Sequence, residues 1–127
     1  MEFTSLDDYN RVKSLLVQIE EAIMQLKDWN ADVSSADEYY RSSTGMQKLA
    51  ASCMLIEAIG EGIKQIDKVT KGKLLGERPE VPWVDVMGIR NHIAHGYFDI
   101  DGDVIYKSVR EDLDALQEAV KYFLMTI

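Results

Sequence analysis

The chain has 127 residues, 46% hydrophobic and 28% charged, a composition typical of a folded domain and not of a disordered chain. The formal net charge of −8 argues against a general nucleic-acid-binding surface, because phosphate contacts require basic side chains. A single cysteine excludes a disulfide within the chain, and no apolar run approaches the roughly 18–20 residues of a membrane helix. The acidic N-terminus lacks the pattern of a secretion signal. We therefore expect one domain over residues 1–127, without membrane association and located in the cytoplasm.

The first expected helix spans residues 5–29. Ser5 and Asp8 have the spacing of a capping box at its start. Apolar residues then recur at three- and four-residue steps on one stripe, namely Leu6, Tyr9, Val12, Leu16, Ile19, Ile23 and Leu26. The pattern breaks at residues 30–34. A second capping box, Ser35 with Glu38, predicts a short helix that follows.

A longer helix is expected over residues 46–70, after an interruption at residues 42–45. Its apolar positions are Leu49, Met54, Ile56, Ile59, Ile63 and Ile66. Gly60 and Gly62 lie inside it, and each costs about 1 kcal/mol of helix propensity relative to alanine. Close approach of another backbone or a ligand explains them, and so does simple tolerance of small residues. Cys53 is expected to be a buried small residue.

A polar, basic loop is expected at residues 71–80, and Pro82 suits the first turn of the helix that follows. That helix should begin near Trp83 and end near His95, with Gly96 as its capping glycine. Residues 98–106 are expected to be extended, with a turn at residues 101–102.

A third capping box, Ser108 with Glu111, predicts the start of the last helix. The stripe of this helix comprises Val109, Leu113, Leu116, Val120, Phe123 and Ile127. The elements together predict an all-α fold. Short connections favour an antiparallel up-and-down bundle of four main helices plus one short helix.

Residues 88–97 contain both histidines of the chain, with Arg90 before them and Tyr97 after them. A histidine that titrates near neutrality can give or take a proton in phosphodiester chemistry, and the forked donors of an arginine suit a phosphate. Alternatively, these groups cap the C-terminus of a helix, where the dipole favours cations. The residues alone slightly favour the capping role.

Other candidate sites are weaker. Asp99, Asp101 and Asp103 imitate the start of a calcium loop, but Val104 stands where the loop requires glycine. His92 and His95 could begin a metal site, but no third ligand is near in the sequence. We therefore expect no metal and no cofactor.

Two further groups allow alternative interpretations. Lys64, Lys68, Lys71 and Lys73 could form a local basic track for RNA, although a solvated helix end is the simpler explanation. The adjacent residues 39–41, Tyr-Tyr-Arg, could stack on bases, but such aromatic residues more often pack.

The segment Arg90–Tyr97 resembles the R-x4-H-x-Y signature of the HEPN superfamily, and specifically of its HepT-like branch. Residues 56–64 are similar to the central helix of that branch, with its glycine-glutamate pair. Residues 82–89 resemble the lead-in to the arginine, and residues 99–105 resemble the acidic and apolar segment after the tyrosine. The resemblance covers nearly the whole chain, from residue 5 to residue 125.

The resemblance implies an all-α homodimer whose cleft brings two copies of the motif together. Active members of the family are metal-independent ribonucleases, many of them toxins in toxin–antitoxin pairs. Arg90 and His95 are then the catalytic pair, with Arg90 on the phosphate and His95 in proton transfer. Asn91 and Glu61 are supporting residues, and His92 is placed with them in an open role.

Tyr97 matches the tyrosine that a cognate nucleotidyltransferase antitoxin can modify with AMP. Such a modification adds bulk and negative charge where an RNA phosphate must lie, which would inactivate the enzyme. The expected reaction is RNA cleavage that leaves a 2′,3′-cyclic phosphate. The alternative is a non-catalytic helical partner of a nucleotidyltransferase.

Overall fold

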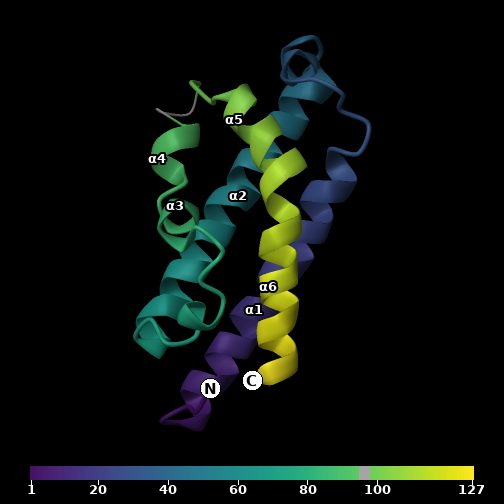
Figure 1. Ribbon diagram of the computed structural model, residues 1–127. Helices are drawn as coiled ribbons and strands as arrows, with labels where there is room; N and C mark the ends of the chain where they lie inside the picture. The colour runs from purple at the N-terminus through teal and green to yellow at the C-terminus, as the bar shows by residue number, and fades with distance from the viewer. Residues whose placement is uncertain (95–97) are drawn as a thin grey trace.

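The computed structural model describes residues 1–94 and 98–127. Helices make up 76% of it and these residues contain no strand, which confirms the expected all-α class. The long helices are α1 (Leu6–Trp29), α2 (Ser43–Thr70) and α6 (Leu113–Thr126). Figure 1 shows α1 and α2 running in opposite directions, α3 and α4 rising beside α2, and α6 returning so that both termini lie at one end. None of the helices described is both long and apolar enough to span a bilayer.

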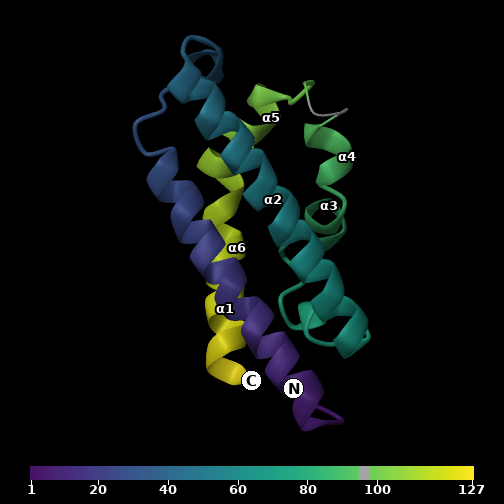
Figure 2. The same cartoon turned by 180° about the vertical axis from the view of Figure 1, so that it is seen from behind.

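Helix α1 begins and packs as its sequence predicts. The Ser5 hydroxyl accepts a hydrogen bond from the backbone N–H of Asp8 at 3.1 Å, so the first cap is confirmed. The buried face of the helix consists of Val12, Leu16, Ile19, Ile23 and Leu26. Leu6 is the exception at 72% exposed, because it lies in the first turn, where the helix reaches the end of the bundle (Figure 2).

The short helix η1 (Ala36–Tyr40) is a 3₁₀ helix with a different cap from the one expected. Ser35 makes no side-chain cap; instead the Glu38 carboxylate accepts hydrogen bonds from the backbone N–H and the hydroxyl of Ser34, at 2.6 and 2.8 Å. The side chain of Tyr39 is fully buried, and its hydroxyl donates to Asn30 Oδ1 at 2.7 Å. Burial raises the pKa of Tyr39 to about 12. The packing interpretation of this tyrosine is therefore confirmed.

Helix α2 begins at Ser43, earlier than expected, because the Ser42 hydroxyl accepts a hydrogen bond from Gly45 N–H at 3.0 Å. Cys53 is buried as expected, and burial, with a smaller effect of Glu57, raises the pKa of its thiol. Met54 was expected to face the core, but it is 63% exposed.

The two glycines of α2 mark close contacts with two different neighbours. A Cβ at Gly60 would lie 2.8 Å from the backbone oxygen of Val86 and 3.1 Å from Cγ2 of Ile89. A Cβ at Gly62 would lie 3.1 Å from Cδ1 of Ile19 on α1. Of the two explanations of these glycines, close approach is therefore the correct one. Both are buried by their own chain.

The helix expected over residues 83–95 is interrupted and ends early. Its two parts are α3 (Trp83–Met87) and α4 (Arg90–Ile93), and Gly88 lies at the end of α3. Ala94 is extended and pairs with Ile100 in an isolated antiparallel bridge. That pairing draws the chain out of the helix before Gly96, which lies outside the described residues.

The prediction of an extended segment at residues 98–106 is wrong for its second half, because that part of the chain forms α5 (Gly102–Lys107). Asp101 is its N-cap, because its carboxylate accepts from the N–H groups of Asp103 and Val104 at 3.1 and 3.2 Å. The helix continues through η3 (Ser108–Asp112), a π-helical turn, into α6. Ser108 therefore lies inside a helix, and the third capping box was wrong.

Trp83 fastens α3 to the rest of the bundle. Its indole N–H donates to the backbone oxygen of Arg78 at 2.8 Å, and its ring lies 5.9 Å from that of Phe123 on α6. The backbone of α3 also packs against Gly60 of α2. The residues that follow α3 are thus placed by contacts with both α2 and α6.

Candidate functional site

Helix α4 is a single tight turn that exposes its polar residues and buries one apolar residue. The backbone N–H of Asn91 donates to Gly88 at 3.1 Å, and that of His92 donates to Ile89 at 2.9 Å. The side chains of Arg90, Asn91 and His92 are all exposed, whereas Ile93 is fully buried. Ile93 therefore anchors the turn, and the three polar side chains face solvent.

The chain leaves α4 and returns through a hydrogen-bonded base. Ala94 pairs with Ile100, and the backbone N–H of Asp101 donates to the backbone oxygen of Ile93 at 2.8 Å. The two ends of the segment that contains residues 95–97 are therefore joined to each other. His95 and Tyr97, the predicted proton-transfer and modification residues, lie outside the described residues together with Gly96.

Tyr40 fixes the returning end of this segment. Its hydroxyl donates to the backbone oxygen of Ile100 at 3.1 Å and accepts from the N–H of Gly102 at 3.0 Å. A Cβ at Gly102 would lie 2.6 Å from that hydroxyl, so a larger residue there would displace the Tyr40 side chain. Sequence reasoning placed Tyr40 in a packing pair but missed this role, because the contact joins residues far apart in the chain. The available signal was the glycine after Asp101, which allows such an approach.

Helix α2 supports the other side of the candidate site. Gly60 is in contact with Ile89. Glu61, which follows Gly60, and Arg90, which follows Ile89, are both exposed. Within residues 1–94 and 98–127, no hydrogen bond or ion pair joins Glu61 to Arg90, Asn91 or His92. The structure thus brings the two backbones together, and the described residues contain no hydrogen bond or ion pair between these side chains.

The four candidate RNA-binding lysines lie toward the far end of α2. Lys64 and Lys68 are exposed on the helix, and Lys71 follows it with a left-handed φ of 53°. Lys73 is exposed in the loop. Figure 1 shows the C-terminal end of α2 below α4 on the same side of the bundle, because the chain rises through α3 before it reaches α4. The lysines are therefore not gathered around Arg90 within one chain.

An exposed guanidinium on a well-anchored turn can bind an anion. Arginine stays charged, and its planar fork matches two oxygens of a phosphate. Asn91 and His92 add amide and imidazole groups that can donate to the same anion. The geometry of the described residues therefore suits recognition of a phosphodiester.

The fold and this turn define a class: an all-α bundle that presents an Arg-Asn-His turn between its second and last long helices. The chain belongs to the Ribonuclease HepT-like family, whose model matches residues 19–123. The match includes Arg90, the turn and the whole R-x4-H-x-Y segment. The family resemblance is therefore confirmed.

Curated relatives agree with the family match. A Thermococcus cleftensis protein named "Probable ribonuclease HepT" is 30% identical over 105 residues, which are 83% of this chain and 88% of that protein. A Methanocaldococcus jannaschii protein with a provisional RNase name is 28% identical over 110 residues, 87% of this chain and 94% of that protein. A second protein of that organism, also provisionally named an RNase, is 25% identical over 114 residues, 87% of this chain and 88% of that protein. No solved structure matches the chain.

Proposed function

We propose that the protein is a metal-independent endoribonuclease whose catalytic residues are Arg90 and His95. The observation that carries this proposal is the match to the Ribonuclease HepT-like family over residues 19–123, a span that includes the intact Arg-x4-His motif. The exposed, anchored position of Arg90 supports it, because a polymeric substrate must reach the guanidinium from solvent.

The proposed reaction is an internal transfer at one phosphodiester. The RNA 2′-oxygen forms a bond to phosphorus as the bond from phosphorus to the 5′-oxygen breaks. The 2′-hydroxyl proton passes to a base, and the leaving 5′-oxygen receives a proton, so the products are a 2′,3′-cyclic phosphate and a 5′-hydroxyl. His95 carries the proton and Arg90 stabilises the additional charge on the phosphoryl oxygens. Asn91 supports Arg90 or the RNA, and Glu61 orients Arg90 or a histidine.

Cleavage of RNA by the purified protein in EDTA tests this proposal. Wild type should leave 2′,3′-cyclic phosphate ends, identified by mass spectrometry, and Arg90→Ala and His95→Ala should each abolish cleavage while keeping the helical circular dichroism spectrum. His92→Ala is the informative comparison, because His92 lies on the same turn but outside the motif pair. Cleavage that survives both motif substitutions overturns the site. No cleavage by the wild type favours the alternative, a non-catalytic partner of a nucleotidyltransferase.

We further propose that two copies associate through the outer face of α2. Met46, Ala50, Met54 and Ala58 are exposed at four-residue steps, so they form one uncharged ridge along the helix. Glu61 continues the ridge by one turn. Gly60 and Gly62 are not part of this ridge, because both are buried within the chain. Pairing along the ridge would bring Glu61 of both copies, and the α4 turns beside them, toward one cleft.

Sedimentation velocity tests this association. The wild type should be a dimer at micromolar concentration, and Met54→Glu should shift it to monomer, because burying an unpaired carboxylate costs several kcal/mol. Met24→Glu is the matched control: Met24 is 57% exposed on α1, away from the ridge. A monomeric wild type, or equal effects of the two substitutions, contradicts the proposed face.

We propose that the physiological partner is a nucleotidyltransferase antitoxin encoded beside this gene, which transfers AMP to Tyr97. Incubation with that enzyme and ATP should add one adenylyl group, and Tyr97→Phe should not accept it. Adenylylation should also end RNA cleavage, because it adds a negative charge beside the site. Adenylylation without loss of cleavage would remove the regulatory role of Tyr97 and leave the catalytic proposal intact.

The lysines at the end of α2 are proposed to extend the RNA-binding surface. Because they lie away from α4 within one chain, their contribution should be to affinity and not to the chemical step. Lys68→Gln together with Lys71→Gln should raise KM and reduce its salt dependence while leaving kcat near the wild-type value. An unchanged KM would mean that these lysines are an ordinary solvated helix end and do not bind RNA.

A further inference from the structure

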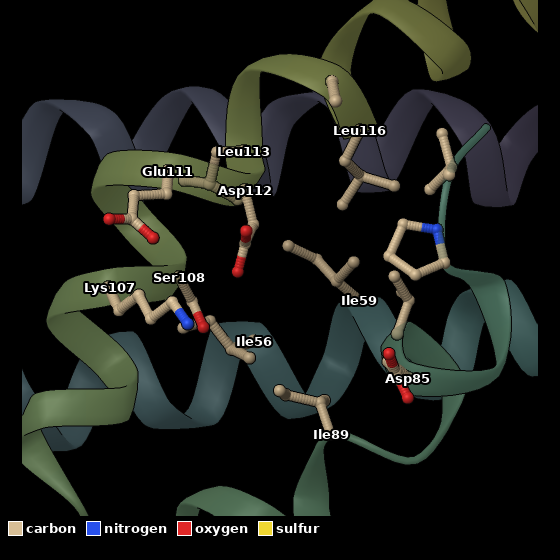
Figure 3. Close-up of a pocket in the computed structure, with 14 residues that line it drawn as sticks. Ile56, Ile59, Asp85, Ile89, Lys107, Ser108, Glu111, Asp112, Leu113 and Leu116 are labelled. Carbon is tan, nitrogen blue, oxygen red and sulfur yellow. The ribbon is translucent and has the colours of Figure 1, made fainter.

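A cavity of about 350 Å³ lies between α2, α3 and the helix formed by η3 and α6. This volume is within the range of small-molecule sites, roughly 300–1,000 Å³. Figure 3 shows that isoleucines of α2 and the segment before α4 form its apolar floor, with leucines of α6 above them. The apolar part of the lining includes Ile56, Ile59, Ile89, Leu113 and Leu116.

Charged side chains stand around this apolar floor on two sides. Asp85 lines the cavity from α3, whereas Glu111 and Asp112 line it from η3 (Figure 3). Lys107 is the one cation among the lining residues. The rim therefore carries three carboxylates and one ammonium, a net charge of −2, and the carboxylates belong to opposite walls.

One polar side chain of the wall, that of Ser108, is open to the cavity. Ser108 is only 8% exposed, lines the cavity, and its hydroxyl makes no hydrogen bond within the described part of the chain. In Figure 3 its oxygen points into the hollow. A hydroxyl both donates and accepts hydrogen bonds, so Ser108 gives this largely apolar cavity a polar group that can contact a ligand. The π-helical turn that carries Ser108 is itself a feature frequent at functional sites.

We propose that this cavity binds an aliphatic diamine or polyamine, with its methylene chain over the isoleucines and an ammonium group at each wall. The apolar floor suits the methylene chain, because burying it removes apolar surface from water. Two ammonium groups match the net charge of −2 and reach Asp85 on one wall and Asp112 on the other. The Ser108 hydroxyl accepts one further hydrogen bond from the ammonium group on its side.

The environment of Asp112 is consistent with a missing cation. Burial raises the pKa of its carboxyl, Glu111 raises it further, and Lys107 only partly opposes this rise. Asp85 faces it across the cavity. An added ammonium group would relieve this unfavourable burial of negative charge. Ile89 lines the cavity but Arg90 does not, and ligand binding here does not depend on the proposed nuclease activity.

The test measures the binding of a series of chemically matched probes. Binding is detected in NMR titrations by shifts of the methyl signals of Ile56, Ile59 and Ile89. The probes are α,ω-diaminoalkanes of increasing length, 1-aminoalkanes and α,ω-diols of equal length. A diamine of optimal length should bind roughly tenfold more tightly than its monoamine, because the second charged hydrogen bond is worth on the order of 1.5 kcal/mol. The diol should not shift these signals.

Substitutions separate this site from general attraction of cations to an acidic protein. Asp85→Asn and Asp112→Asn should each lower diamine affinity to the monoamine level, and Lys107→Gln should raise it, because a competing cation is removed. Glu118→Gln is the matched control, because this exposed carboxylate of α6 lies outside the lining. Equal affinity for diamine and monoamine, or equal losses in Asp112→Asn and Glu118→Gln, overturns the proposal.

Discussion

The hydroxyl of Tyr40 and the backbone N–H of Gly102 are joined by a hydrogen bond of 3.0 Å, although the two residues are 62 positions apart in the chain. The same hydroxyl donates to Ile100. This one phenol thereby ties the connection between α1 and α2 to the start of α5. It fixes the end of the segment that carries the family motif.

Tyr40→Phe should therefore loosen the start of α5 more than the rest of the protein. Both hydrogen bonds of the hydroxyl are lost, at a cost of about 1 kcal/mol because the site is partly solvated. Amide hydrogen exchange should show a larger loss of protection at Gly102 than at Phe123 in the core. The control is Tyr106→Phe, which removes a hydroxyl that donates to Ser34 at 2.8 Å. Equal changes at Gly102 in both variants would contradict the role of Tyr40.

Gly60→Ala should destabilise the protein despite the better helix propensity of alanine. The new Cβ would lie 2.8 Å from a backbone oxygen of α3, which cannot move without displacing the helix. Overpacking of this kind costs about 1–3 kcal/mol, against a propensity gain of about 1 kcal/mol. Urea unfolding measures the difference. Gly76→Ala is the control, because no atom lies within 4 Å of its added Cβ; an equally stable Gly60→Ala would show that α3 can shift.

Tyr39→Phe should remove the donor to a buried acceptor. The Asn30 side chain accepts from Tyr39 and donates to Ser52 at 2.9 Å and to the backbone of Leu26 at 2.8 Å. Loss of the hydroxyl leaves Asn30 Oδ1 without this partner, at a cost of about 1–3 kcal/mol. Tyr122→Phe, which removes a hydrogen bond to Glu77 near the surface, should cost less. Equal costs in urea unfolding would show that water replaces the Tyr39 hydroxyl.

The raised pKa of Tyr39 also predicts a dependence on alkaline pH. The unfolded phenol ionises near pH 10, whereas the folded one keeps its proton to about pH 12. Ionisation therefore stabilises the unfolded state first, and the stability contributed by Tyr39 falls as pH rises from 10 to 12. The stability difference between the wild type and Tyr39→Phe should shrink over this window in urea titrations. A difference that stays constant would mean that the folded phenol ionises as readily as the unfolded one.

Asp112→Asn should stabilise the protein at neutral pH. Because burial raises the pKa of the folded carboxyl above its ordinary value of 3.8, the fold prefers the protonated form. The wild type therefore loses stability as pH rises through this range, and asparagine does not. The advantage of the variant should disappear below pH 3.8, where the carboxyl is protonated in both states. Glu118→Gln should lack this pattern; finding it there would assign the effect to net charge.

The sequence predicts the helices that depend on a local pattern. The apolar stripe of α1 and the cap at Ser5 are both as expected, since each arises from residues within a few positions of one another. Ser42 was read as part of an interruption, although its spacing to Gly45 permits the cap that it makes. Such errors move a boundary and leave the element intact.

The errors around the candidate site have a different physical origin. Asp101 was interpreted as part of a turn, but the same residue type also begins helices, and here its neighbours are held by Tyr40. The early end of α4 depends on the pairing of Ala94 with Ile100. Contacts between distant segments decide both points, and no local pattern in a single sequence contains them. Arg90 is exposed although Ile93, three positions along and on the same side of the turn, is fully buried, so helical periodicity alone does not predict its exposure.

The π-helical turn has a consequence for the number of residues that this part of the chain requires. The buried residues Ile105, Val109 and Leu113 are spaced by two consecutive steps of four, which drift by about 40° each on a regular α-helix. The wider turn of η3 absorbs that drift and keeps α5 and α6 facing the same core. Deleting one exposed residue of this turn, such as Glu111, should therefore restore a regular helix without rotating α6 away from its partners. The same deletion would move Ser108 relative to Asp112. It should therefore change the shape of the cavity while the packing of the bundle is kept.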